Sequence, residues 1–268
     1  MRLWLRVSQI CVGNPNKKSR MKKFKLIRSK PADAVYNMSL DRRIFEDYLR
    51  DRVPVLRIYS WQRPSFTYGI SQLPQGHINL SACAADGIDL AKRMTGGGIL
   101  FHDNEITYSF VCGKEDIGEP QNVFVSYRKI CAFLIHFYGS LGLKAQFALE
   151  TEDFVCRQEP SEFCSASHEK YDITINQKKI GGNAQKRARQ AIFQHGSVPI
   201  SMDWSIARRY LKSFPDMTLD VATSLSEELN PVPERDILEG KLIRAFADIF
   251  GVVFSEENNY SHEAVMVK

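Results

Sequence analysis

The chain lacks several features that would place it in a specialised class of protein. Its 268 residues contain no run of about 18 apolar residues, the length that a membrane-spanning helix needs. The six cysteines are scattered, with no Cys-x-x-Cys pair and no histidine at zinc spacing, so neither a metal knuckle nor a disulfide framework is predicted. A chain of this length buries enough surface to fold without such staples. We therefore expect a cytoplasmic protein with no metal site and no membrane contact.

Acidic residues are absent from the first 32 positions, which hold ten of the 36 lysines and arginines. The other 26 basic residues are outnumbered by 31 acidic ones, so the net charge of +5 comes from this segment alone. A net negative body offers no general basic field for nucleic acid. Residues 1–22 are predicted to be a disordered basic leader, with an organellar transit peptide or a translation start at Met21 as alternatives. Residues 23–268 are predicted to form one domain, in a monomer.

Periodic patterns predict an α+β fold. Alternating, strand-forming residues occur at 56–61, 65–69, 98–102, 106–111, 144–149, 171–175, 178–182 and 191–198. Helices are predicted over 123–141, where apolar residues recur every three or four positions, and near 205–213 and 233–250. Because the strands come in hairpins with helices inserted between them, we expect a mixed, largely antiparallel sheet flanked by helices. The polar stretch 151–170 has no period, and loops of that length are usually functional or disordered.

Three consecutive glycines occur in Arg93-Met-Thr-Gly-Gly-Gly-Ile-Leu-Phe-His-Asp103. Glycines let the main chain approach a ligand closely with its N–H groups exposed. Such a loop can hold an anionic group or a carbonyl oxygen, with Arg93 supplying charge. The pattern matches neither the P-loop nor the dinucleotide-binding motif. On the glycines alone, a plain turn between two strands is the simpler interpretation.

A second stretch, 178–187, contains Lys-Lys-Ile-Gly-Gly-Asn-Ala-Gln. A lysine held on a strand beside glycines can stabilise negative charge developing on a ligand carbonyl, and Lys179 is the candidate. The other basic residues nearby are interpreted as a solvated hairpin; they are Lys178, Lys186, Arg187 and Arg189. Cys164, in the long polar stretch, is a candidate nucleophile, because a thiol near a basic side chain can have a lowered pKa. A lone loop cysteine is, however, most often inert.

These segments together resemble the two signature regions of the lipoate–protein ligase and octanoyltransferase superfamily, which is related to biotin protein ligases. The motifs are Arg-x-Thr-Gly-Gly-Gly, His-Asp, Lys-Ile-Gly-Gly-Asn-Ala-Gln and His-Gly-Ser, at 93–98, 102–103, 179–185 and 195–197. Their combination is specific and overturns the plain-turn interpretation. The resemblance runs from Asp33 to Gly251 and implies a fold like the catalytic core of class II aminoacyl-tRNA and biotin synthetases.

The resemblance also implies a site. The catalytic residues would be Cys164 and Lys179, with Lys179 against the acyl carbonyl and the glycines covering the acyl chain. The residues that it assigns to substrate and acyl binding are Arg93, Thr95, Gly96, Gly97, Gly98, His102, Asp172, Gly182, Asn183, Ala184 and His195. An eight-carbon tail needs an apolar channel, whose wall we expect to include Trp61, Phe66, Tyr68, Ile99 and Tyr108.

Two chemistries compete within the superfamily. Octanoyltransferases move the acyl group from acyl carrier protein, through a cysteine thioester, to a lysine of a lipoyl domain or of glycine-cleavage H protein, without ATP. Ligases form a lipoyl-adenylate and need ATP and magnesium. Cys164 lies seven residues before Tyr171, as in the Bacillus-type octanoyltransferases, so the resemblance favours the transferase.

Two features keep the ligase as the alternative. An aromatic residue is expected after the cysteine, but Ser165 stands there, and Tyr171-Asp172 with Gly-Gly-Asn-Ala also fits ligases. A third possibility, from another class, is a non-catalytic acyl-binding paralogue. Loss of Lys179 or of the glycine loop would mark such a paralogue, and both are present.

Overall fold

A computed structural model describes residues 21–151, 170–213, 221–256 and 260. Its main sheet has six strands, which follow one another across the sheet as β10 (Asn183–Arg187), β11 (Ile192–Ser201), β6 (Asn104–Cys112), β2 (Val55–Tyr59), β1 (Lys22–Arg28) and β13 (Val252–Glu256). Strand β1 is parallel to both of its neighbours, and the other pairs are antiparallel. Residues 1–20, most of the predicted leader, lie outside the described residues, and Lys22 already belongs to β1.

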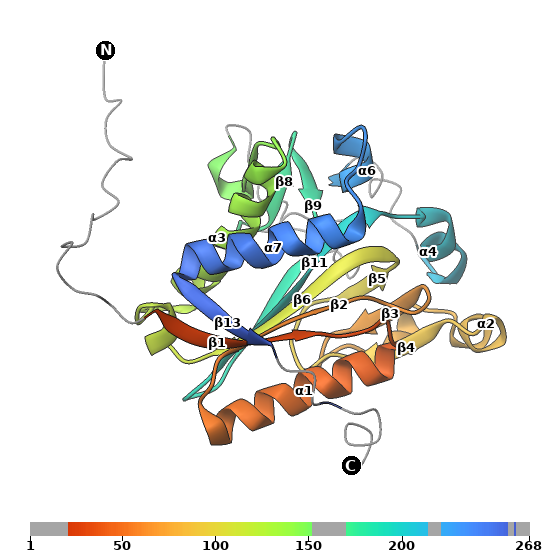
Figure 1. Cartoon of the computed structure of the whole chain (residues 1–268). Helices are drawn as coiled ribbons and strands as arrows, with labels where there is room; N and C mark the ends of the chain where they lie inside the picture. The colour runs from red at the N-terminus through yellow and green to blue at the C-terminus, as the bar shows by residue number, and fades with distance from the viewer. Residues whose placement is uncertain (1–20, 152–169, 214–220, 257–259, 261–268) are drawn as a thin grey trace.

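Helices cover both faces of this sheet (Figure 1). Helix α1 (Ala34–Asp51) lies on one face, and α3 (Val123–Ser140) packs beside α7 (Arg235–Phe250) on the other. The core under α3 and α7 is aromatic: the ring of Phe246 lies 4.8 Å from that of Phe110 and 5.1 Å from that of Phe133. This amphipathic pairing explains why the sequence periodicity located α3 and α7 closely.

Two smaller sheets stand beside the main one. The first contains, in spatial order, β4 (Asp89–Lys92), β3 (Ser65–Tyr68) and β5 (Ile99–His102). The second contains β12 (Ala222–Thr223), β9 (Lys178–Ile180), β8 (Ile173–Ile175) and β7 (Ala145–Phe147). The α+β class is thus confirmed, and the strands divide among three mixed sheets rather than one.

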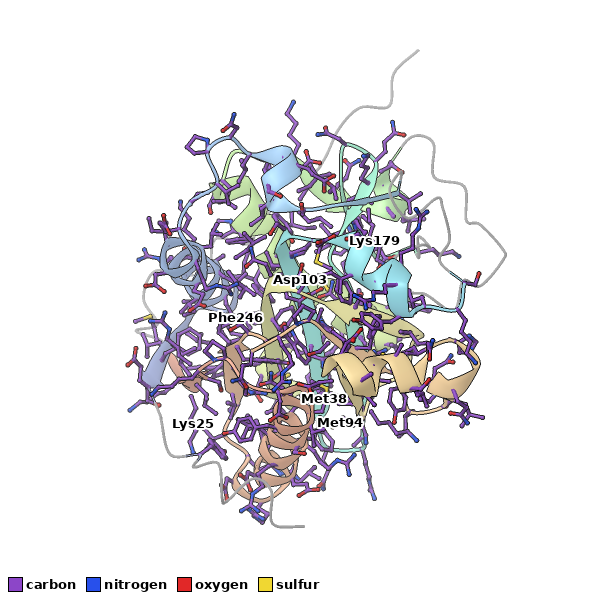
Figure 2. The ribbon with its side chains drawn as sticks, turned by 90° about the vertical axis from the view of Figure 1, so that its right-hand side faces the viewer. Lys25, Met38, Met94, Asp103, Lys179 and Phe246 are labelled. Atoms are coloured by element: carbon purple, nitrogen blue, oxygen red, sulfur yellow. The ribbon has the colours of Figure 1, made fainter. Side chains whose placement is uncertain are left out.

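Short helices complete the described fold. They are α2 (Leu80–Asp86), α4 (Trp204–Tyr210) and α6 (Leu225–Glu228), with 3₁₀ turns at 74–76, 115–117 and 148–150. Figure 2 shows Met38 of α1 and Met94, just after β4, on the same side of the molecule, in keeping with the contact between α1 and β4. No helix in the described part of the chain is both long and apolar enough to cross a membrane.

Candidate active site

A cleft of about 290 Å³ opens between the glycine loop, residues 93–98, and the first turn of α3. Eight of the predicted site residues line it: Arg93, Gly96, Gly97, Asp172, Lys179, Gly182, Asn183 and Ala184. At its open side lie the exposed side chains of Val123 and Phe124, and the Phe124 ring is 5.3 Å from that of Tyr171. The cleft therefore combines an apolar rim with a charged pair.

That charged pair is Lys179 and Asp172, whose side-chain nitrogen and carboxylate oxygen are 2.8 Å apart. The two side chains are only 7% and 6% exposed, so they form a buried ion pair in the wall of the cleft. Lys179 lies on β9 and Asp172 just before β8, the two strands of one hairpin. The turn is Asn176-Gln177, as the sequence predicted, and both residues have positive φ, at 49° and 66°. A tight hairpin thus fixes the lysine in the wall of the cleft.

Arg93 holds the glycine loop rather than standing open to a ligand. Its guanidinium donates hydrogen bonds to the carbonyl oxygens of Gly98 at 2.8 Å and Gly96 at 3.2 Å, and to the hydroxyl of Thr67 at 2.9 Å. The side chain is 1% exposed. Because one buried guanidinium holds two carbonyl groups of the loop and ties them to Thr67 of β3, the curvature of the loop depends on Arg93.

His102 supports the same loop from below. Its Nε2 lies 2.7 Å from the Thr67 hydroxyl and its Nδ1 lies 3.0 Å from the Glu105 carboxylate. A carboxylate only accepts, so Nδ1 carries the proton, and in the neutral ring Nε2 accepts from Thr67. Trp61 stacks on the imidazole at 4.0 Å and donates to Glu105. His102 therefore orients Thr67, and through it Arg93, and lies beneath the cleft rather than in it.

His195 contacts the loop at a second point. Its Nε2 lies 2.8 Å from the Thr95 hydroxyl, and its Nδ1 lies 3.6 Å from the Asp41 carboxylate. Burial lowers the pKa of His195, and Asp41 only partly opposes this effect. A neutral imidazole whose Nδ1 carries the proton, on the Asp41 side, accepts a hydrogen bond at Nε2 from the Thr95 hydroxyl. Both predicted histidines thus position the glycine loop.

Asp41 anchors this second contact in the core. Its carboxylate accepts from Arg57 at 2.7 Å, Ser109 at 2.7 Å and Tyr59 at 3.0 Å. Burial raises the pKa of Asp41, but Arg57, His195 and Ser109 outweigh burial and bring the net pKa below its ordinary value. The side chains of Arg57 and Asp41 are 0% and 2% exposed, so they form a buried ion pair between α1 and β2.

The model of the lipoyl protein ligase A/B catalytic domain family matches residues 33–247 of the chain. The chain belongs to this family. It is 29% identical to Octanoyltransferase LipM of Clostridioides difficile (strain 630) over 257 residues, which cover 92% of this chain and 94% of that protein. It is 31% identical to Octanoyltransferase LipM of Kyrpidia tusciae over 243 residues, which cover 86% and 88%. The resemblance inferred from the motifs is confirmed.

A solved structure shares the family fold. The crystal structure of lipoate-protein ligase A bound with ATP superposes with a TM-score of 0.73 at 22% identity, over 91% of this chain and 92% of that one. Among the described residues, no group of three or more His, Cys, Asp or Glu side chains is placed to hold a metal ion. The predicted nucleophile Cys164 lies outside the described residues, so its distance from Lys179 stays a prediction.

Two of the predicted acyl-binding residues make contacts that hold the strands of the site together. The side-chain oxygen of Asn183 accepts from the Tyr108 hydroxyl at 2.7 Å, and Ala184 lies opposite His195 in the β10–β11 ladder. Of the predicted channel wall, Trp61 lines an inner cavity of about 20 Å³ beneath the cleft. The side chains of Phe66, Ile99 and Tyr108 are at most 1% exposed and belong to the hydrophobic core instead.

Sequence reasoning missed the residues that anchor the family's glycine loop from beneath: Thr67, Glu105 and Asp41. Polar residues in a strand or helix carry no local sign of burial. One signal was available, since Arg57 stands inside the apolar strand Val55–Tyr59 and a buried arginine needs a carboxylate partner. That signal predicts a buried acid without saying which one.

Gly69 gives a test of how tightly this family member holds the loop. A Cβ at position 69 would lie 2.0 Å from the carbonyl oxygen of Gly97, so Gly69→Ala must push the loop aside. We expect a loss of about 1–3 kcal/mol in the free energy of unfolding, measured by chemical denaturation. Gly76→Ala is the matched control, because a Cβ there meets no atom within 4 Å. Equal stability of the two variants would contradict the close packing.

Proposed function

We propose that this chain is an acyltransferase of protein lipoylation. It takes an octanoyl or lipoyl group from acyl carrier protein onto Cys164 and passes it to a lysine of a lipoyl domain or glycine-cleavage H protein. Two findings support this: relatives named octanoyltransferase align over most of the chain, and the buried Lys179–Asp172 pair lines an apolar-rimmed cleft. The observation on which the proposal mainly rests is the position of Lys179 in the wall of this cleft.

The first half-reaction is a thioester exchange. The Cys164 thiolate attacks the carbonyl carbon of the acyl thioester, and a new carbon–sulfur bond forms as the carbonyl oxygen becomes negative. Lys179, held in the wall of the cleft, and main-chain N–H groups of the glycine loop stabilise this oxyanion. The intermediate collapses by breaking the bond to the carrier's thiol, which leaves as a thiolate and takes up a proton.

The second half-reaction forms an amide. The neutral amine of the acceptor lysine attacks the thioester on Cys164, loses a proton, and releases the cysteine thiolate. Since a thioester already activates the acyl group, the reaction requires neither ATP nor magnesium. Burying the six methylenes and the terminal methyl of an octanoyl tail contributes about 5–6 kcal/mol to binding, at about 0.8 kcal/mol for each group, before the ordering costs. Burial of the tail positions the reacting carbonyl beside Lys179, but it does not make the carbonyl more reactive.

The test uses purified full-length protein with octanoyl acyl carrier protein and no ATP. We expect mass spectrometry to detect one hydroxylamine-labile octanoyl group on Cys164, and a lipoyl domain added afterwards to gain it on a lysine. Cys164→Ala should abolish both products. Cys156→Ala, a change in the same polar stretch, is the matched control and should retain both.

Other results would support the alternatives. If the lipoyl domain is modified only with ATP, magnesium and free octanoate or lipoate, and Cys164→Ala retains this activity, the chain is a ligase that acts through an acyl-adenylate. If neither set of conditions modifies the carrier and the protein still binds octanoate, it is a non-catalytic acyl-binding paralogue.

A further inference from the structure

Leu100 lies on β5, in the smaller sheet that also contains β3 and β4, and it packs differently from the other large apolar side chains there. Its neighbours on β5, Ile99 and Phe101, are 1% and 3% exposed and pack in the hydrophobic core, whereas Leu100 is only partly buried. Leu100 belongs to none of the hydrophobic clusters formed by the described residues. Since Leu100 packs into no core cluster, its position is not explained by core packing, and the spaces around it become the relevant feature.

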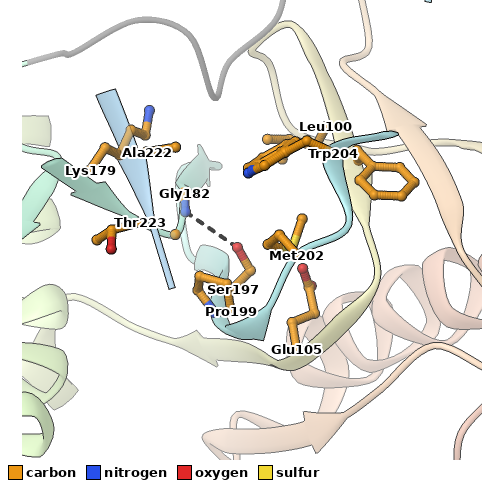
Figure 3. A pocket seen from close by; sticks show the side chains of 12 residues that line it. Leu100, Glu105, Lys179, Gly182, Ser197, Pro199, Met202, Trp204, Ala222 and Thr223 are labelled. Carbon is orange, nitrogen blue, oxygen red and sulfur yellow. Dashed lines mark hydrogen bonds between the residues drawn. The ribbon is translucent and has the colours of Figure 1, made fainter. Parts of the chain in front are cut away.

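Three empty spaces meet at Leu100. It lines the cleft of about 290 Å³, the inner cavity of about 20 Å³ under Trp61, and a side cavity of about 30 Å³ beside Trp204. Figure 3 shows the side cavity, with Leu100 and Trp204 on one side and Lys179 on the other. Gly182 also lines all three spaces. These two residues, which line all three spaces, form the partition between the cleft and the inner and side cavities.

The partition separates an exposed lining from a buried one. The open side of the cleft is formed by the exposed residues Gly96, Val123 and Phe124. The inner cavity, in contrast, is bounded by buried side chains such as Trp61 and His102, which are 8% and 5% exposed. A chain that enters past the rim therefore meets Leu100 before it can extend further inward.

We propose that Leu100, facing Gly182, is the specificity-determining residue that sets the length of the acyl chain the cleft accepts. This inference rests on the proposed acyl transfer. Removing most of the leucine side chain joins the cleft to the buried cavities and admits longer chains. A methyl group at Gly182 shortens the cleft, and it can be built without strain. The new Cβ would lie 3.7 Å from Leu100 Cδ2, an ordinary contact, and the backbone of Gly182 lacks a positive φ.

The experiment compares kcat/KM for hexanoyl, octanoyl, decanoyl and dodecanoyl acyl carrier protein with a lipoyl domain as acceptor. Leu100→Ala should raise the decanoyl-to-octanoyl ratio at least about tenfold over the unsubstituted protein. Gly182→Ala should raise the hexanoyl-to-octanoyl ratio by a similar factor. Leu73→Ala, a truncation of a leucine that is 67% exposed, is the matched control and should leave both ratios unchanged.

The two proposals fail separately. If the unsubstituted protein transfers no acyl group of any length, the proposed function fails. If it transfers octanoyl groups and both variants keep its chain-length profile, the proposed function stands and the role assigned to the partition is wrong. Should Leu100→Ala not fold, as its melting curve would show, the Gly182→Ala ratio alone decides, because that variant fills space instead of emptying it.

Discussion

Lys179→Met is expected to slow octanoyl transfer about 100- to 1,000-fold, the usual effect of losing one donor to a developing oxyanion. Methionine keeps the length and apolar body of the lysine, so the cleft stays filled while the charge is lost. The rate to measure is single-turnover transfer from octanoyl acyl carrier protein to the lipoyl domain. The matched control is Lys178→Met, because the neighbouring lysine is outside the lining of the cleft and is only partly buried.

The variant also leaves Asp172 buried beside an apolar group, and that change can lower stability independently of catalysis. A double variant, Lys179→Met with Asp172→Asn, removes the carboxylate charge as well. We expect it to recover the melting temperature but not the transfer rate. A double variant as fast as the unsubstituted protein would mean that Lys179 acts only as a structural partner of Asp172.

Asp41→Ala is expected to cost about 3–5 kcal/mol of unfolding free energy, because it strands the guanidinium of Arg57 in the core without its carboxylate. Guanidinium chloride denaturation at pH 7 measures this loss, at a pH where the lowered pKa of Asp41 keeps the carboxylate charged. The matched control is Asp47→Ala in the same helix. Asp47 pairs with Arg43 and Arg50, which are 39% and 61% exposed, and accepts a hydrogen bond from Tyr260. Pairs with such exposed arginines contribute about 1 kcal/mol or less each.

Asp41→Asn refines this prediction, since it keeps the shape of the side chain and removes only the charge. If Asp41→Asn is as stable as the unsubstituted protein, hydrogen bonding rather than charge holds Arg57. Asp41→Ala and Asp47→Ala losing equal stability would contradict the buried ion pair altogether.

The sequence predicted those elements whose pattern is local. The apolar spacing of 123–141 anticipated α3, and Asn176-Gln177 anticipated the hairpin that carries Lys179, because helix periodicity and turn chemistry are written in neighbouring residues. It missed β1 and β13. Their pairing is parallel, joins Lys22 to Val252, and depends on a contact between segments at opposite ends of the described chain. No short window of sequence contains that information.

The site divides in the same way. The motifs located Lys179 and the glycine loop, and the resemblance added Asp172, because these residues stand in continuous stretches. The residues that hold the loop are spread over four elements: Asp41 on α1, Thr67 on β3, and His195 and Glu105 on β11 and β6. Only folding brings them together, so their partnership was out of reach of the spacing arguments.

The β1–β13 pairing has a consequence for synthesis. β1 leaves the ribosome early, but the strand that will cover its outer edge is translated near the end of the described chain. Until β13 is made, the N–H and C=O groups along the outer edge of β1 are unpaired, and a strand of another nascent chain can pair with them. Lys22, Lys23 and Lys25 lie along β1, and we expect repulsion between these like charges to disfavour pairing of two nascent chains through this edge before β13 is made.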